Sequence, residues 1–223
     1  MGILYIVATP IGNLKDITLR ALETLKSVDL ILAEDTRVTK KLLISYSIKK
    51  PISRYDERTD YAKCKKIAER LTKGEKIALV TDAGTPGISD PGWRLVQIIS
   101  IEAPEIDIVP IPGPSSVITA LSVSGISGRE FSFLGYPPHK KGRNIFFKKL
   151  ALIEIRPIIF FESSHRIKKA FESMAEFFGE TYRIMIFREL TKIYEEIWCG
   201  TLEEAKKHFI GEKTKGEFVI IIK

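Results

Sequence analysis

The sequence is poor in cysteine and histidine. Only two of its 223 residues are cysteine and three are histidine. Cys64 and Cys199 lie far apart without a CxxC companion, so we expect reduced, buried thiols and neither a redox motif nor a zinc site. The histidines, His139, His165 and His208, are not at a paired metal-ligand spacing. We therefore predict no metal centre.

Segments that would direct the chain to a membrane are also absent. No stretch approaches the roughly 18 to 20 consecutive apolar residues of a membrane span. Residues 1–13 form a short apolar run and a turn, without the basic start and long apolar core of a secretory signal. We predict a soluble, cytoplasmic protein with no membrane partner.

Positive charge is in excess, with 35 Lys and Arg against 28 Asp and Glu and a net charge of +7. A basic chain attracts polyanions, which makes RNA or DNA a candidate partner, although a generally basic proteome explains the charge equally well. Residues 36–55 and 137–150 contain several basic residues and no acid. Such segments are usually a solvated helix face, and Phe146 and Phe147 in the second are expected in the core. Two acid-free segments nevertheless favour an RNA-binding surface.

Short β-branched runs alternate with amphipathic stretches in the first half of the chain. Thr18 is a good N-cap, and apolar residues follow it at helical spacing. The alternation predicts a mostly parallel sheet with helices on both faces. The expected strands are 4–8, 30–33, 77–81 and 106–110, and the expected helices are 18–28, 36–43, 61–71 and 91–99.

Residues 109–114 contain three prolines and one glycine. This segment cannot continue a helix or a central strand, so it marks a rigid crossing or a domain boundary. After it, strands follow one another with little room for helices, which predicts a mixed sheet. The expected strands are 131–134, 158–161, 183–187, 193–199 and 218–222, and the expected helices are 145–152, 165–178 and 202–209. The fold prediction is α/β with two domains, 1–112 and 113–223.

Three loops in the first half have an unusual composition. They are residues 9–13, residues 82–92 with three glycines and two prolines, and residues 112–116 with two serines that open a helix. Glycines let backbone amides approach a ligand, and ligands of open parallel sheets bind at the loops after the strands. Each loop alone is consistent with an ordinary turn, whereas the three together predict a small-molecule pocket. The dinucleotide fingerprint GxGxxG and a Walker A sequence are both absent, which argues against a classical nucleotide triphosphate site.

Collinear motifs over residues 4–219 resemble one protein family. Residues 10–14, 16–18 and 20–22 look like its N-terminal signature, and residues 216–219 look like its closing strand. The matches between them are residues 33–37, 82–92, 112–115, 162–166 and 188–192. By these motifs the chain is similar to the ribosomal RNA small subunit methyltransferase I family of the tetrapyrrole methylase superfamily.

This resemblance implies an S-adenosylmethionine-dependent methyltransferase that modifies a cytidine ribose 2′-hydroxyl in the decoding region of small-subunit (16S) rRNA. It also implies two αβα domains with the cofactor in a cleft between them, and a homodimer. The substrate would be small-subunit rRNA or the 30S subunit. Longer family members carry an additional C-terminal helical segment after the closing strand, where this sequence ends.

The resemblance also places a cofactor site on the loops. For Ile88 and Phe161, the alternative to cofactor binding is that the side chain simply packs in the core. The implied cofactor-binding residues are Pro10, Asp82, Gly84, Thr85, Pro86, Ile88, Ser115, Ser116, Phe161, Leu190 and Gly216.

Methyl transfer to a hydroxyl is an in-line displacement that needs a base or an electrostatic aid. The catalytic candidates are Glu189, Lys192, Glu162 and Asp35. A helix beginning at Glu162 would place it on one face with His165; the alternative is that Glu162 pairs with Arg166 or caps its helix. Arg188 and Glu189 are equally consistent with an internal ion pair. The candidate RNA-binding residues are Arg37, Lys140, Lys141, Arg143, His165, Arg166 and Arg188.

Two other functions remain open at this point. A tetrapyrrole C-methyltransferase of the precorrin type would also suit a basic cleft. The second is a non-catalytic RNA-binding assembly protein, which would retain the cofactor pocket but transfer no methyl group.

Overall fold

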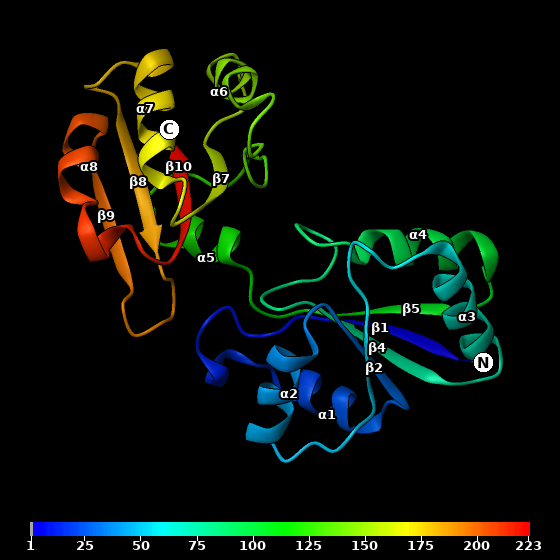
Figure 1. Cartoon of the computed structure of the whole chain (residues 1–223). Coiled ribbons are helices and arrows are strands. Elements are labelled where there is room, and N and C mark those ends of the chain that lie inside the picture. Colours follow the sequence, from blue (N-terminus) through cyan, green and yellow to red (C-terminus); the bar gives the residue numbers. More distant parts are fainter. Residues whose placement is uncertain (1) are drawn as a thin grey trace. The chain divides into compact units, whose positions relative to one another are not determined.

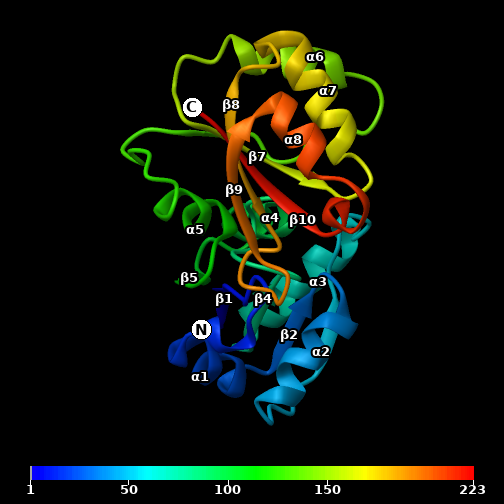
Figure 2. The same cartoon turned by 90° about the vertical axis from the view of Figure 1, so that its left-hand side faces the viewer.

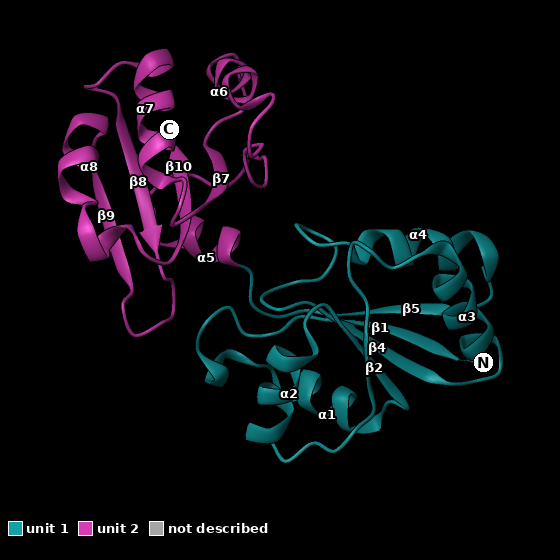
Figure 3. Ribbon diagram, viewed as in Figure 1, with its two compact units in different colours: residues 1–115 teal, residues 116–223 magenta. Residues whose placement is uncertain are grey.

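The computed structural model describes residues 2–223, and the chain divides into two compact units, one ending at Ser115 and one beginning at Ser116 (Figure 3). The division lies at the end of the proline-rich segment, three residues after the boundary expected from the sequence. Each unit contains one five-stranded sheet. The predicted α/β class is confirmed.

The sheet of the first unit is entirely parallel, with the strand order β3-β2-β4-β1-β5. Its central strands are continuous apolar runs because helices cover both faces. The strands are β1 (Ile3–Val7), β2 (Leu30–Ala33), β3 (Ile52–Arg54), β4 (Lys76–Val80) and β5 (Asp107–Ile111).

Two helices cover each face of this sheet, as the ribbon of the first unit shows (Figure 1). α1 (Leu19–Ser27) and α2 (Thr36–Ser45) pack on one face, and α3 (Tyr61–Thr72) and α4 (Gly92–Glu102) pack on the other. Thr18, Asp35 and Asp60 cap the first three helices with side-chain oxygens that accept backbone N–H bonds. A short 3₁₀ helix, Leu14–Asp16, precedes α1.

The strand expected over residues 106–110 corresponds to β5, which includes Pro110 as predicted. β5 continues through Pro110 to Ile111 and pairs with β1 alone. Because β5 is an edge strand, the missing N–H of Pro110 removes no bond from a second neighbour. The prediction from the sequence missed β3, which has only three residues.

The sheet of the second unit is mixed, as predicted, with the order β6-β7-β10-β8-β9. β6 and β7 are parallel, and β10 is antiparallel to both β7 and β8 (Figure 2). β8 and β9 are antiparallel. The strands are β6 (Ser132–Phe133), β7 (Ile158–Ser163), β8 (Arg183–Arg188), β9 (Glu196–Thr201) and β10 (Glu217–Ile222).

Helices α6 (Arg143–Ala151), α7 (Ile167–Phe178) and α8 (Leu202–His208) pack on one face of this sheet. The core between them includes Phe147, Phe160 and Phe171, each with no exposed surface. α5 (Ser116–Ser122) contacts β10 and contributes nothing to that core, which places it on the other face. A 3₁₀ helix, Gly211–Thr214, leads into β10.

Three local expectations are wrong in the second unit. Glu162 lies within β7, so no helix begins there and it does not share a helical face with His165. Ile193 and Tyr194 lie outside β9, in the exposed turn before it. Cys199 is exposed on the edge strand β9, whereas Cys64 is a buried free thiol as expected.

Within residues 2–223, no helix has the length and apolar character needed to cross a membrane. The same residues contain no group of three or more His, Cys, Asp or Glu side chains arranged to hold a metal ion.

Candidate active site

A first candidate site lies within the first unit, where β1 and β4 end. These strands are neighbours, yet β1 leads to α1 on one face of the sheet and β4 leads to α4 on the other. Connections that diverge in this way open a crevice at the carboxyl edge of a parallel sheet. Residues 9–13 and 82–91 begin at this crevice.

Backbone hydrogen bonds join these two loops. The Thr9 N–H donates to the Gly84 carbonyl at 2.9 Å, and the Gly84 N–H donates to the Thr9 carbonyl at 3.1 Å. Gly84 has φ +81°, a conformation that favours glycine. The Thr85 hydroxyl donates to the Pro114 carbonyl at 3.2 Å, which ties in the third loop. The structure therefore brings together all three loops singled out in the sequence.

Two carboxylates lie beside this frame. The Asp35 N–H donates to Asp82 Oδ1 at 2.9 Å, which links the ends of β2 and β4. Burial raises the pKa of Asp82, and the neighbouring charge of Glu34 raises it further against the opposing effect of the Asp35 N–H. Asp35 forms a bidentate ion pair with Arg37, and this pair lowers the pKa of Asp35 to about 2. Asp35 is thus already engaged by its neighbour and is a poor proton acceptor.

The long loop after β4 is folded around Asp90. Asp90 accepts hydrogen bonds from the Gly87 and Gly92 N–H groups, and a Cβ at Gly92 would lie 2.8 Å from Asp90 Oδ1. Ile88 is 58% exposed, so it is not a core residue. It lines a surface cavity of about 350 Å³ together with Trp93 and others. The remaining lining residues are Glu57, Ser89, Asp90, Pro91 and Arg94.

Other cofactor candidates occupy different environments. Pro10 is half-buried and Pro86 is buried, both on the joined loops. Ser115 ends the first unit, and Ser116 is the first residue of α5.

A separate cluster of candidate residues lies within the second unit, on one edge of its sheet. β7 and β8 end at this edge and β10 begins there, with Glu217 opposite Ser163 and Phe218 opposite Arg188. The candidates Phe161, Leu190 and Gly216 belong to these segments. Phe161 is half-buried and Leu190 is buried.

Lys192 joins two carboxylates at this edge. Its Nζ lies 2.9 Å from Glu189 Oε1 and 2.7 Å from Glu217 Oε2, and the Glu217 N–H also donates to Glu189 Oε1 at 2.9 Å. Burial acts to lower the pKa of Lys192, but the bonds to Glu217 and Glu189 outweigh it and raise the pKa overall. Burial acts to raise the pKa of Glu189, but Lys192 and the Glu217 N–H outweigh it and lower the pKa overall. Lys192 is therefore an ammonium and Glu189 a carboxylate at neutral pH.

The backbone around this cluster is in an uncommon conformation. Glu189 has φ +51° and Thr191 has φ +64°, although neither is glycine. Non-glycine residues in the left-handed region are strained and concentrate at functional sites. The strain supports a functional role for the turn that follows β8.

Glu162 is enclosed by two arginine side chains. It is fully buried, and Oε2 lies 2.7 Å from Arg143 Nη2 while Oε1 lies 3.0 Å from Arg166 Nε. The alternative that Glu162 pairs with Arg166 is confirmed. Arg143 is only 3% exposed, so it cannot contact RNA at the surface as predicted.

Arg188 is also engaged within the protein. It donates to the backbone carbonyls of Lys215, Tyr194 and Glu212, and its side chain is 11% exposed. Its nearest carboxylate is that of Glu196 at 3.8 Å, so the suggested pair with Glu189 does not form. Arg188 fixes the turn after β8 and is not offered to RNA.

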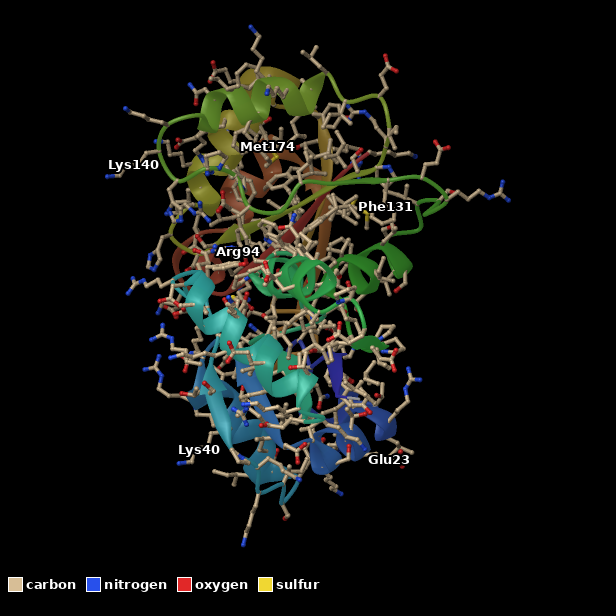
Figure 4. The ribbon with its side chains drawn as sticks, turned by 90° about the vertical axis from the view of Figure 1, so that its right-hand side faces the viewer. Glu23, Lys40, Arg94, Phe131, Lys140 and Met174 are labelled. Carbon is tan, nitrogen blue, oxygen red and sulfur yellow. The ribbon has the colours of Figure 1, made fainter. Side chains whose placement is uncertain are left out.

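The other RNA candidates are accessible to different degrees. Arg37, Lys140, Lys141 and His165 are exposed, and Figure 4 shows Lys140 extending away from the ribbon of the second unit. Arg166 is half-buried. Phe147 lies in the core as expected, and Phe146 packs against it.

Two residues of the second edge were not predicted. Glu217 was inside the closing motif at residues 216–219 without an assigned role, and its acidic side chain in an otherwise apolar strand was the available signal. Tyr136 immediately precedes the acid-free segment 137–150, and nothing in the sequence pattern distinguished it.

Comparisons with known proteins agree with this architecture. A model of the tetrapyrrole (corrin/porphyrin) methylases matches residues 3–206. The chain is 46% identical to "Ribosomal RNA small subunit methyltransferase I" of Thermotoga maritima, over 100% of this chain and 98% of that protein. This chain belongs to the ribosomal RNA small subunit methyltransferase I family. Proteins of the same name from Synechocystis sp. and Bacillus subtilis are 45% and 44% identical over 100% of this chain and over 79% and 75% of their own lengths.

Solved structures with low sequence identity share the fold of this family member. Diphthine synthase aligns with a TM-score of 0.73 at 15% identity, covering 100% of this chain and 90% of that one. The methyltransferase CobJ aligns with a TM-score of 0.71 at 17% identity, covering 100% of this chain and 94% of that one. The predicted family, its methyltransferase class and its fold are therefore confirmed.

Proposed function

We propose that this chain is an S-adenosylmethionine-dependent enzyme that methylates the ribose 2′-hydroxyl of a cytidine in the decoding region of small-subunit (16S) rRNA. The observation that carries the proposal is the 46% identity to a ribosomal RNA small subunit methyltransferase I over the whole chain. We further propose that it acts as a cytoplasmic homodimer on the rRNA or on the assembled 30S subunit.

The loops of the first unit fit the cofactor. The hydrogen bonds between Thr9 and Gly84 hold the two loops side by side, and the half-buried Asp82 accepts the Asp35 N–H on Oδ1. A ligand with an amino acid group, ribose hydroxyls and an adenine needs this mixture of backbone groups, a carboxylate and apolar surface. The exposed Ile88 supplies apolar surface. The residues of these loops that would hold the cofactor are Pro10, Asp82, Gly84, Thr85, Pro86, Ile88, Ser115 and Ser116. Phe161, Leu190 and Gly216 remain cofactor-binding candidates from the family resemblance.

The cofactor, when bound, supplies an electrophilic methyl group on a sulfonium. The chain must orient the acceptor hydroxyl and manage its proton. Both hydrogen bonds to the Glu189 carboxylate end on Oε1, which leaves Oε2 to accept the hydroxyl proton. Lys192 remains an ammonium and stabilises negative charge as it develops on the acceptor oxygen.

Glu189 is favoured over the other carboxylate candidates by its surroundings. Glu162 is enclosed by two arginines, and Asp35 is held by Arg37. Glu189 keeps one carboxylate oxygen free and is partly exposed at the strand edge.

The RNA surface is proposed to include Arg37, Lys140, Lys141 and His165. Their positive charges neutralise backbone phosphates, and their removal lowers affinity in a salt-dependent way. Arg143, Arg166 and Arg188 are left out because their guanidinium groups are engaged within the second unit.

The test is a methyl-transfer assay with labelled S-adenosylmethionine. Its acceptors are small ribosomal subunits and naked small-subunit rRNA, both from cells that lack this protein. We expect label at one cytidine whose 3′ linkage then resists alkaline cleavage. Absence of label in both acceptors, with the cofactor bound, would overturn the proposal in favour of a tetrapyrrole substrate or a non-catalytic role.

A substitution tests the assignment of the base within the same assay. Glu189→Gln keeps the size of the side chain and removes its basicity, so we expect turnover to fall about 10²- to 10⁴-fold. Cofactor affinity, measured by calorimetry, should stay near the wild-type value. Glu195→Gln, on the same turn, is the matched control and should retain more than half of the turnover. Unchanged turnover in Glu189→Gln would remove Glu189 from the mechanism.

A further inference from the structure

Tyr136 lies at the same edge of the second sheet as the Glu189 cluster. It follows β6, and the carbonyl of the preceding Gly135 accepts a hydrogen bond from the Phe161 N–H at 2.8 Å. β7, which carries Phe161, ends beside the start of β10 and thus beside Glu217. Tyr136 remains 45% exposed at this edge.

One side of the Tyr136 ring is supported by the protein. The Phe161 ring lies 5.2 Å away, centroid to centroid, at 58°. The Arg166 guanidinium carbon lies 5.8 Å from the Tyr136 centroid. Phe133 in turn packs edge-on against Phe161 at 4.9 Å. An aromatic side chain that is supported in this way and still nearly half exposed presents a firm apolar surface to a ligand.

Arg166 is itself fixed in place. Its Nε lies 3.0 Å from both Glu162 Oε1 and Ser163 Oγ, and its Nη1 donates to the Pro137 carbonyl at 2.9 Å. It therefore holds both the ring of Tyr136 and the backbone of the next residue. Glu162 is anchored by Arg143 on its other oxygen. The ion pairs of Glu162 with Arg143 and Arg166 thus fix the guanidinium that lies over the Tyr136 ring.

The Tyr136 hydroxyl is not a proton acceptor. Burial raises its pKa, and the negative charge of Glu217 raises it further against the opposing effect of Arg166. The side chain is a neutral phenol at neutral pH. It offers a ring face and a hydrogen-bond donor, which are suited to recognition and not to proton abstraction.

We propose that Tyr136 is the platform on which the base of the methylated nucleotide stacks, and that Arg166 is its positioning residue. The inference rests on the proposed function, since it names the contact that holds the acceptor nucleotide near Glu189 and Lys192. Proteins that recognise unpaired bases stack them on aromatic side chains. Stacking of one base on Tyr136 would explain why this ring is exposed. The ring lies beside Glu189 and Lys192, which would activate the ribose of the same nucleotide.

The test compares variants of Tyr136 in the methyl-transfer assay. Stacking of one base is lost in Tyr136→Leu, so we expect kcat/KM for the RNA to fall about 10- to 100-fold. Tyr136→Phe keeps the ring and should stay within about threefold of wild type. Cofactor affinity should be unchanged in both. Tyr61→Leu, at a tyrosine of the first unit that is 53% exposed, is the matched control and should have no effect.

The role of Arg166 is tested by comparing the effect of its substitution in the wild-type protein with the effect in the Tyr136→Leu variant. Arg166→Lys keeps the charge and removes the planar fork, so we expect a higher KM for RNA with a smaller change in kcat. In the Tyr136→Leu background the same substitution should add less than twofold. Normal kcat/KM in Tyr136→Leu, or full additivity of the two changes, would overturn the inference. Failure of the wild-type protein to label any RNA would instead overturn the proposed function, so the two failures are distinct.

Discussion

Gly216 leaves the space that the side chain of Glu189 occupies. A Cβ built at Gly216 would lie 2.5 Å from Glu189 Cγ and 2.8 Å from Glu189 Oε1, and Gly216 has φ +111°. The family resemblance assigned Gly216 to the cofactor. Its contact in the structure indicates that the absence of a side chain there also serves the proposed base.

Gly216→Ala should therefore displace Glu189. The added methyl group collides with the Glu189 side chain, which must give up its bonds to Lys192 and the Glu217 N–H. Misplacement of a catalytic group by about 1 Å costs on the order of 10²-fold in rate, and we expect kcat for methyl transfer to fall by about that amount. Gly179→Ala is the control for backbone strain, because Gly179 has φ +85° and nothing within 4 Å of its Cβ position. Equal loss of kcat in both variants would show that strain alone is responsible.

The sequence predicted the strands and helices well where the hydrophobic pattern was long. The central strands of the first sheet and α3 are within a residue or two of their expected bounds. β3 was missed because three residues are too short for a period to be visible. Pro110 was predicted as the last residue of a strand, and it lies within β5, but the sequence alone did not show that β5 is an edge strand.

The candidate site was predicted less completely, for a different reason. Motifs located the turn containing Glu189 and Lys192, but the contacts that distinguish a free carboxylate from an enclosed one join residues far apart in the chain. Glu162 and Arg143 are separated by 19 positions, and their pairing converts a predicted acid and a predicted RNA contact into one buried unit. Only the folded structure shows that pairing.

The ion pair of Asp35 and Arg37 should make stability depend on pH. The pKa of Asp35 is about 2 in the folded protein, against an ordinary value of 3.8. Because the folded value is depressed, the stabilisation is fully present above about pH 4 and is lost as the pH falls toward 2. Asp35→Asn keeps an N-cap for α2 and removes the charge. Urea denaturation should show a less stable variant at pH 6 and a smaller difference from wild type near pH 3. A difference that stays constant with pH would contradict this assignment.

Removal of the buried charge at Glu162 should strongly destabilise the second unit. Glu162→Gln leaves Arg143 and Arg166 without their carboxylate, and breaking a buried pair costs about 3–5 kcal/mol. Denaturation can be followed in a Trp93→Phe background, in which Trp198 is the only tryptophan and reports on this unit. Glu180→Gln removes an exposed pair with Lys206 and should cost less than about 1 kcal/mol. Similar losses in the two variants would mean that the buried position adds nothing.

Charge reversal at Lys140 and Lys141 should weaken RNA binding in a salt-dependent manner. Both side chains are exposed in the segment before α6, which contains no acid. Each phosphate contact with single-stranded RNA contributes roughly 0.7 to the slope of log affinity against log salt concentration, so loss of two contacts should flatten that slope by about 1.4. Lys65→Glu with Lys66→Glu, an exposed pair on α3, makes the same change of net charge elsewhere. If the two double variants bind small-subunit rRNA equally and with equal slopes, net charge and not this segment governs binding. If only the Lys140 and Lys141 variant loses affinity, the segment before α6 is part of the RNA surface.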